Sequence, residues 1–221
     1  MEEKESENIQ APSNNKKDER PEVIIVRNWK EYLGESLLIV FSVALAIILT
    51  EVFTKIHENQ QTREVLHQLK LEIINNNESE EIQYRYHLKV LQNIDSALHH
   101  EKFRKTFLDS GQVHLQAIAP DGVLRVDLND IAWQVAKQNN IFSKVSLETY
   151  RLLTDIYDNQ ARIIKSEDEI GKLLLSFESR ESGNANATLI LMRDIYKAWA
   201  VDRAPRLLKN YKKAINALSD Y

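Results

Sequence analysis

One uncharged, strongly apolar segment constrains this chain more than any other feature of its sequence. Residues 36–50 contain no charged side chain and consist of Leu, Ile, Val, Ala and Phe with two Ser and one Thr. At ~1.5 Å per helical residue this stretch spans only ~22 Å, but extending it to Leu33 and Phe53 brings it close to the ~30 Å of a bilayer core. We therefore predict a transmembrane helix, with its juxtamembrane cap, over residues 28–53.

Two other kinds of segment have a similar composition. A buried helix this uniformly apolar in a soluble protein needs a large protein around it. A cleavable signal peptide is normally complete by residue ~30. Here the apolar run begins only at residue 36, and its small-residue cleavage pattern, Ala44-Leu45-Ala46, lies inside the run. An uncleaved signal anchor fits the sequence better than either alternative.

The distribution of basic residues predicts the orientation of this anchor. Residues 16–35 contain five Lys and Arg, and residues 51–70 contain three. Because cytoplasmic flanks of membrane helices are enriched in Lys and Arg, the N-terminus is expected in the cytoplasm and residues 54–221 outside it. The protein would then lie in a bacterial inner (cytoplasmic) membrane with its C-terminal domain in the periplasm. Residues 1–27, rich in charged and amide side chains, are predicted to be a disordered cytoplasmic tail.

Two sets of residues in the anchor are candidate functional positions. Ser42, Ala46 and Thr50 are small and spaced by four, so they share one helix face through which two membrane helices can approach and dimerise. Glu35 and Glu51 lie near the two ends of the apolar segment. Both carboxylates are expected at headgroup level; the alternative is that one of them is an ion or proton site inside the membrane.

The remaining chain carries no net charge. The first 53 residues hold six of the 29 Lys and Arg and ten of the 33 Asp and Glu, so residues 54–221 contain 23 of each. A protein that binds a nucleic-acid backbone needs an excess of basic residues. The composition therefore argues against nucleic-acid binding, and the expected partners are the lipid bilayer, a second copy of the chain, or another membrane protein.

Scarcity of helix breakers predicts an all-α fold. The chain has five Gly and four Pro, and none of either lies between Gly34 and Gly111. The membrane helix is thus expected to continue into a bundle of four to five helices, partly by coiled-coil-like packing. The apolar phase slips over residues 75–81, which indicates a kink or a solvated turn of a long helix. Ile156, Ile163, Ile170 and Phe177 recur every seven residues and predict an amphipathic helix.

One stretch of residues 54–221 has no helical pattern. Residues 120–122, Pro-Asp-Gly, form a strong turn signal, and the segments on either side of it alternate partially between apolar and polar. The sequence leaves two structures open for residues 113–128, a small hairpin or a plain loop.

No arrangement of side chains predicts a catalytic, cofactor or metal site. There is no Cys, no phosphate-binding glycine loop and no nucleophile elbow. Glu64 and His67 form one half of a di-iron motif without its second copy. His57-Glu58 and His100-Glu101 begin a zinc-protease motif, but the closing His is missing in both. We therefore expect a protein without enzymatic activity or cofactor.

Two segments support a resemblance to a known family. Residues 28–35, NWKEYLGE, which lead into the apolar run, resemble the anchor of a family of uncharacterised bacterial single-pass membrane proteins. The later patterns, Ala-Trp at 132–133, L-x-x-Y at 147–150 and Y-x-x-Q at 157–160, are similar to that family's helical region. The resemblance covers residues 27–220 and implies a location in the bacterial envelope. The family has no assigned activity, so no functional residue is carried over.

These observations favour a non-enzymatic single-pass membrane protein with a periplasmic helical interaction domain. Two alternatives remain open. One is a sensor-like helical bundle that binds a ligand. The other is an accessory subunit of an ion- or proton-conducting membrane complex, with Glu35 or Glu51 in the conduction path.

Overall fold

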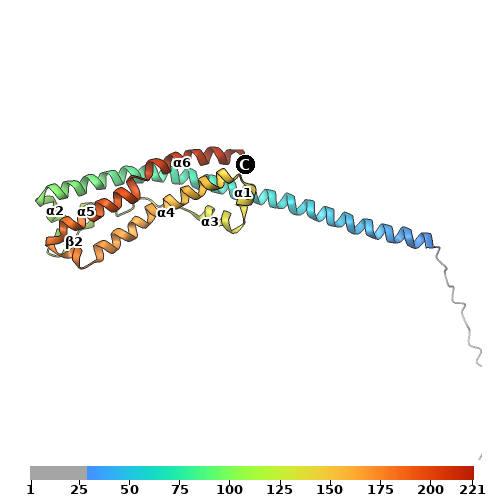
Figure 1. Cartoon of the computed structure of the whole chain (residues 1–221), viewed down its shortest axis with the longest axis horizontal. Coiled ribbons are helices and arrows are strands. Elements are labelled where there is room, and N and C mark those ends of the chain that lie inside the picture. The colour runs from blue at the N-terminus through green and yellow to red at the C-terminus, as the bar shows by residue number, and fades with distance from the viewer. Residues whose placement is uncertain (1–28) are drawn as a thin grey trace, which may run out of the picture. The chain divides into compact units, whose positions relative to one another are not determined.

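The computed structural model describes residues 29–221, so the predicted disordered tail and the Asn28 cap lie outside the described residues. The chain separates into two compact units, Met1–Phe53 and Thr54–Tyr221 (Figure 1). The described part is almost entirely helical, with one pair of two-residue strands. The predicted all-α fold is confirmed.

In the first unit, the described residues form the N-terminal part of helix α1, Trp29–His99. Its large apolar side chains are exposed all along residues 37–53. Among the described residues, α1 is the one helix long and apolar enough to cross a membrane. Its most apolar 18-residue window has a mean hydropathy of 2.5, and none of that window is buried. By length and composition this segment is suited to anchor the chain in a membrane.

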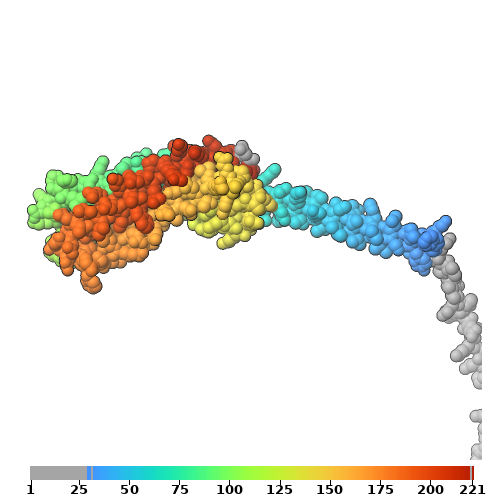
Figure 2. Space-filling model, viewed as in Figure 1, coloured from blue at the N-terminus to red at the C-terminus, as the bar shows by residue number. Residues whose placement is uncertain are grey.

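The second unit is a bundle built on residues 54–99 of α1. Beside them run α4, Leu147–Leu175, and a broken helix made of α5, Ala185–Ile195, a π-helical turn, Tyr196–Val201, and α6, Ala204–Ala217. Both α5 and α6 pack against α4, as the space-filling view also shows (Figure 2). Pro205 lies in the first turn of α6, where a missing N–H costs no helical hydrogen bond, so a helix can restart there.

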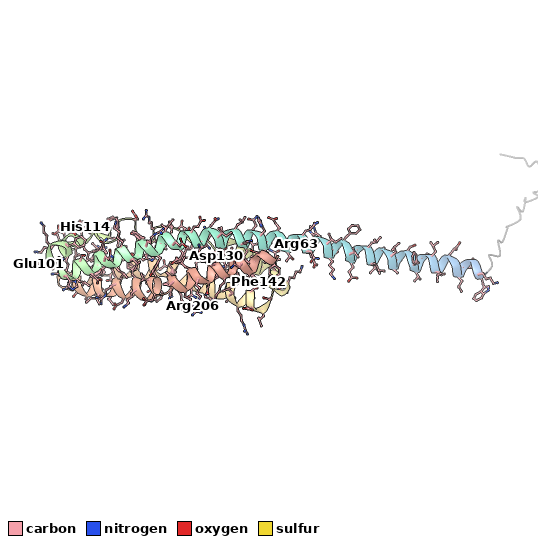
Figure 3. The ribbon with its side chains drawn as sticks, turned by 90° about the horizontal axis from the view of Figure 1, so that it is seen from above. Arg63, Glu101, His114, Asp130, Phe142 and Arg206 are labelled. Atoms are coloured by element: carbon pink, nitrogen blue, oxygen red, sulfur yellow. The ribbon has the colours of Figure 1, made fainter. Side chains whose placement is uncertain are left out.

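Short elements close the bundle at its two ends. At one end lie α2, Glu101–Phe107, and the strands β1, Leu108–Asp109, and β2, Gln112–Val113. The helix α3, Ile131–Gln138, packs toward the other end. In Figure 3, Glu101 and His114 mark the first end, and Arg63 and Phe142 lie toward the second.

The hairpin lies over residues 108–113, whereas the sequence allowed one over residues 113–128. It joins Leu108 to Val113 in an antiparallel pair, and its two turn residues, Ser110 and Gly111, both have positive φ as a tight two-residue turn requires. The Pro-Asp-Gly turn is present, closed by a hydrogen bond from the Gly122 N–H to the Ala119 carbonyl. The segment that follows it has no strand partner, so the plain-loop alternative is the correct one.

Two further predictions are settled by the helices. α1 continues without a break through residues 75–81, and Asn76 and Glu80 within this stretch are buried rather than solvated. In α4, Ile156, Ile163 and Ile170 are fully buried, which confirms the seven-residue repeat. Phe177 departs from it and is 87% exposed, because α4 ends at Leu175.

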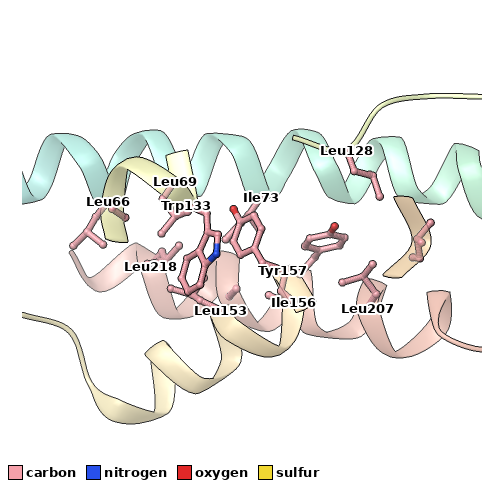
Figure 4. Close-up of a cluster of buried hydrophobic side chains, with 14 of the residues drawn as sticks. Leu66, Leu69, Ile73, Leu128, Trp133, Leu153, Ile156, Tyr157, Leu207 and Leu218 are labelled. Carbon is pink, nitrogen blue, oxygen red and sulfur yellow. The ribbon is translucent and has the colours of Figure 1, made fainter. Parts of the chain in front are cut away.

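Two apolar clusters fill the bundle. The first gathers around Leu69 and Ile73 of α1, with Trp133 of α3 and Tyr157 of α4 (Figure 4). The second lies toward the end that carries the hairpin, and its buried members include Val90, Ile94, Phe107, Ile118, Leu189, Met192 and Tyr196. The buried α1 residues between Ile73 of the first cluster and Tyr86 of the second are all polar, namely Asn76, Glu80 and Gln83.

Candidate functional site

A line of polar side chains runs along the buried face of α1 between the two apolar clusters. These residues follow one another at spacings of four, four, three and four, which places them on one side of a helix. We call them the polar stripe: Glu72, Asn76, Glu80, Gln83 and His87. The last four are each no more than 1% exposed. Burying a polar group costs free energy unless the group is hydrogen-bonded. The hydrogen-bond partners of the stripe therefore show how the fold tolerates these residues in its interior.

Most of the stripe binds the backbone of one segment that is neither helix nor strand, residues 118–129, which we call the strap. The Gln83 side-chain oxygen accepts hydrogen bonds from the N–H groups of Arg125, at 2.8 Å, and Val126, at 3.0 Å. Asn76 pairs with Asn129 in both directions, accepting from its N–H at 2.9 Å and donating to its carbonyl at 2.6 Å. α1 side chains therefore supply the hydrogen bonds that a neighbouring strand would supply in a sheet.

The start of the strap is held in the same way by residues beside the stripe. The Tyr86 hydroxyl accepts from the Asp121 N–H at 3.1 Å and donates to the Gly122 carbonyl at 2.6 Å. Asn93 donates to the Ile118 carbonyl at 2.8 Å. The strap is thus fastened to α1 along its whole length, which fixes the position of the α3 helix that follows it.

His87 is buried in its neutral form. Its Nε2 lies 2.5 Å from the Gln83 side-chain nitrogen and 3.2 Å from the Val123 carbonyl oxygen. A neutral imidazole nitrogen accepts from the first group or donates to the second, but does not do both at once. Burial lowers the pKa of His87 to about 4. The ring is therefore uncharged at neutral pH and packs edge-on against Tyr196, with 5.2 Å between ring centroids.

Glu80 differs from the rest of the stripe because it has no hydrogen-bond partner among residues 29–221. It lies between Asn76 and Gln83, is 0% exposed, and both of its carboxyl oxygens are unpaired within this part of the chain. Burial raises the pKa of Glu80 to about 8. At neutral pH the group is therefore mostly a protonated, uncharged acid, which suits a buried position better than a carboxylate does.

Glu72, at the other end of the stripe, anchors α3. Its carboxylate accepts from the Ala132 N–H at 2.7 Å and from the Trp133 N–H at 3.4 Å, in the first turn of the helix. The same group accepts from the Tyr157 hydroxyl at 2.7 Å. Burial, followed by this hydrogen bond, raises the pKa of Tyr157 above its usual range. A carboxylate at a helix N-terminus also interacts favourably with the helix dipole, so Glu72 fixes α3 against α1 and α4.

Between α1 and α3, next to this anchor, the surface has a groove of about 610 Å³. We call it the α1–α3 groove. Leu71, Ile131 and Val135 line it and remain 41%, 69% and 39% exposed. The other lining residues are Glu64, Val65, Gln68, Glu72, Asn75, Asn129 and Ala132, so none of the lining residues is Lys or Arg.

The site residues expected from the sequence lie in the other unit. Ser42, Ala46 and Thr50 are exposed on α1 and share one face by their helical spacing. The Ser42 hydroxyl donates to the Leu38 carbonyl and the Thr50 hydroxyl to the Ala46 carbonyl, both at 2.8 Å. Their protons are thus used within the helix, and the face they present is one of small side chains.

The two candidate carboxylates of the anchor, Glu35 and Glu51, are also exposed on α1. The near-motif histidines do not converge. His57, His67 and His100 are exposed, and His99 contacts the Asp95 carbonyl of its own helix at 2.7 Å. Within residues 29–221, no group of three or more His, Cys, Asp or Glu is placed to hold a metal ion.

Neither the polar stripe nor the groove was among the sequence-based predictions. The stripe has a signal in the sequence, namely the slip of the apolar phase over residues 75–81, but the slip alone indicates a kink or a solvated turn rather than a buried polar face. Buried and solvated polar residues give the same pattern until their partners are known. The groove had a weaker signal, since Ile131 and Val135 add a second apolar face to a short helix that already buries Trp133.

The chain has no significant match among family models, curated proteins or solved structures. The case for a function therefore depends on the physical features of the chain itself.

Proposed function

We propose that this chain is a single-pass membrane protein of the bacterial cytoplasmic membrane, whose helical domain, residues 54–221, faces the periplasm and binds other proteins without catalysing a reaction. The observation that carries the proposal is the fully exposed apolar part of α1, with a mean hydropathy of 2.5 over 18 residues. Exposed apolar surface of this extent is very unfavourable in water and favourable in lipid. The resemblance of residues 28–35 to the anchor of bacterial envelope proteins supports the same location.

The proposal includes self-association through the anchor. Lipid tails are as apolar as Leu, so membrane helices associate where small side chains allow their backbones to approach closely. The exposed face of Ser42, Ala46 and Thr50 offers this geometry. In the domain, the exposed apolar lining of the α1–α3 groove is a surface suited to a further protein partner.

Membrane fractionation tests the proposal that the chain is anchored. The full chain, expressed in a bacterial host, should stay in the membrane pellet after alkaline carbonate extraction and should be released by detergent. Release by carbonate alone would show a peripheral protein and contradict the anchor.

Co-purification tests the interaction function. The chain is solubilised from membranes in mild detergent, and its size and bound proteins are measured by light scattering and mass spectrometry. We expect a homo-oligomer or a complex with a defined membrane protein. A strictly monomeric species without any bound protein would contradict an interaction domain.

A further inference from the structure

We propose that the α1–α3 groove is a docking site for an amphipathic α-helix of a partner protein, one that carries Lys or Arg beside an apolar ridge. This inference rests on the proposed interaction function and specifies its partner surface. Three properties of the groove carry it: its rigid walls, its exposed apolar lining and the sign of its charge.

The walls of the groove are held in place before any partner binds. Glu72 fixes the first turn of α3 through the N–H groups of Ala132 and Trp133. Beneath the groove, Trp133 stacks on Tyr157 with the rings 4.8 Å apart and 7° from parallel. A groove formed in advance binds more tightly, because less conformational freedom is lost on binding.

Part of the apolar lining of the groove is not needed to pack α3 against the bundle. α3 buries Trp133 and Ala136 against the bundle, which accounts for one face of the helix. Ile131 and Val135, four residues apart, form a second face that is exposed beside Leu71 of α1. A helix that lies in a groove between two helices buries residues at positions i, i+3 or i+4, and i+7. Leu71, Ile131 and Val135 form an apolar surface against which the apolar positions of a docked helix can pack.

The charge of the groove selects the partner. In the described part of the chain, Glu64 and Glu72 are the only charged residues that line it. The Glu72 carboxylate is hydrogen-bonded by uncharged groups alone, so its charge is not neutralised by them. Symmetric pairing of two copies through this groove would bring these carboxylates toward each other, which is unfavourable. A helix with Lys or Arg at its flank is complementary to the groove.

Binding of defined peptides tests this inference. The full chain in zwitterionic lipid nanodiscs is titrated with an amphipathic helical peptide of roughly 15 residues made of Leu and Lys, and with its Leu and Glu counterpart. Empty nanodiscs correct for binding to lipid. We expect the Lys peptide to bind at least about tenfold more tightly. Equal affinity for the two peptides would overturn the proposal.

Substitutions locate the binding. Ile131→Ser should lower the affinity for the Lys peptide by roughly tenfold. Leu175→Ser replaces a similarly exposed apolar side chain at the other end of the bundle and should leave this affinity unchanged. Glu64→Gln should lower the affinity for the Lys peptide and reduce the salt dependence of its binding. An equal effect of the Ile131 and Leu175 substitutions would show non-specific hydrophobic binding and overturn the proposal.

Photo-crosslinking in membranes separates the failure of this inference from that of the proposed function. A photoreactive residue is placed at position 131 and, as a control, at position 175. A crosslink from 131 that maps to a basic amphipathic helix of another protein supports the inference. A crosslink from 131 to a second copy of this chain, or none from 131 while other proteins co-purify, overturns it but leaves the interaction function standing. The absence of any bound protein overturns both.

Discussion

Two buried titratable side chains with opposite shifts determine how the stability of the bundle depends on pH. Burial raises the pKa of Glu80 to about 8, so above pH 4.5 the folded chain keeps a proton that the unfolded chain releases. This contribution to stability is complete below pH 4.5 and is lost as the pH rises through 8. Burial lowers the pKa of His87 from 6.5 to about 4, so its contribution is present above pH 6.5 and is lost as the pH falls through 4.

The two effects oppose each other between pH 4.5 and 6.5, so the effect of Glu80 is seen alone at higher pH. Between pH 6.5 and 8 the free energy of unfolding should fall by roughly 1–2 kcal/mol, because the raised pKa of Glu80 lowers stability by on the order of 1 kcal/mol per pH unit in this range. Glu80→Gln keeps the size of the side chain and has no proton to lose. We expect the variant to lose this decline, as measured by urea unfolding in detergent at a series of pH values.

The neighbouring residue provides the control for this measurement. Glu81 is partly exposed and lies 3.6 Å from Lys212. Glu81→Gln should therefore keep the decline of the unmodified chain between pH 6.5 and 8. A decline that persists in Glu80→Gln, or that disappears in both variants, would contradict a buried, protonated Glu80.

The strap is an element whose structure depends on side chains rather than on a neighbouring strand. Gln83→Leu removes the acceptor for the N–H groups of Arg125 and Val126 and leaves both without that partner. Because Arg125 is exposed and Val126 is half-buried, each lost hydrogen bond should cost about 0.5–1.5 kcal/mol rather than the larger penalty of a fully buried donor. We expect lower thermal stability and, in amide hydrogen exchange, faster exchange concentrated in residues 118–129.

Gln68→Leu is the matched control for the strap. Gln68 lies on the exposed side of the same helix and donates to Glu64, four residues earlier. Its loss should change stability by less than about 0.5 kcal/mol and leave exchange in the strap unaltered. Faster exchange throughout the bundle in Gln83→Leu, with no concentration in the strap, would contradict the role given to Gln83.

The elements show which features local sequence determines and which it does not. The buried face of α4 and the unbroken α1 follow from the spacing of apolar residues and from the lack of Gly and Pro, both of which are local. The sequence leaves residues 113–128 open between hairpin and loop because the hydrogen-bond partners of the strap, Asn76 and Gln83, lie about 40–50 residues earlier in the chain. No short-range pattern reports such a partner. The site depends on the same distant contacts, which is why neither the stripe nor the groove was predicted.

At the scale of the whole molecule, self-association through the anchor can be tested by one substitution. Ala46→Leu places a large side chain on the face of Ser42 and Thr50 and should hinder close approach of two helices. We expect the fraction of dimer to fall severalfold, measured by energy transfer between labelled chains in liposomes. Ala44→Leu, the same change on a different face, should have little effect. Equal dimerisation of both variants and the unmodified chain would contradict association through this face.

The proposed arrangement, an anchored chain with its helical domain outside the cytoplasm, can be measured directly because the chain contains no Cys. Leu175→Cys, at a position 74% exposed in the helical domain, and Ser13→Cys, ahead of the anchor, each give a chain with a single thiol. Both are treated with a membrane-impermeant maleimide in cells whose outer membrane alone is permeabilised. The account predicts labelling at position 175 in these cells and at position 13 only after lysis. The reverse pattern would contradict the orientation, and labelling of neither before lysis would contradict a membrane-spanning anchor.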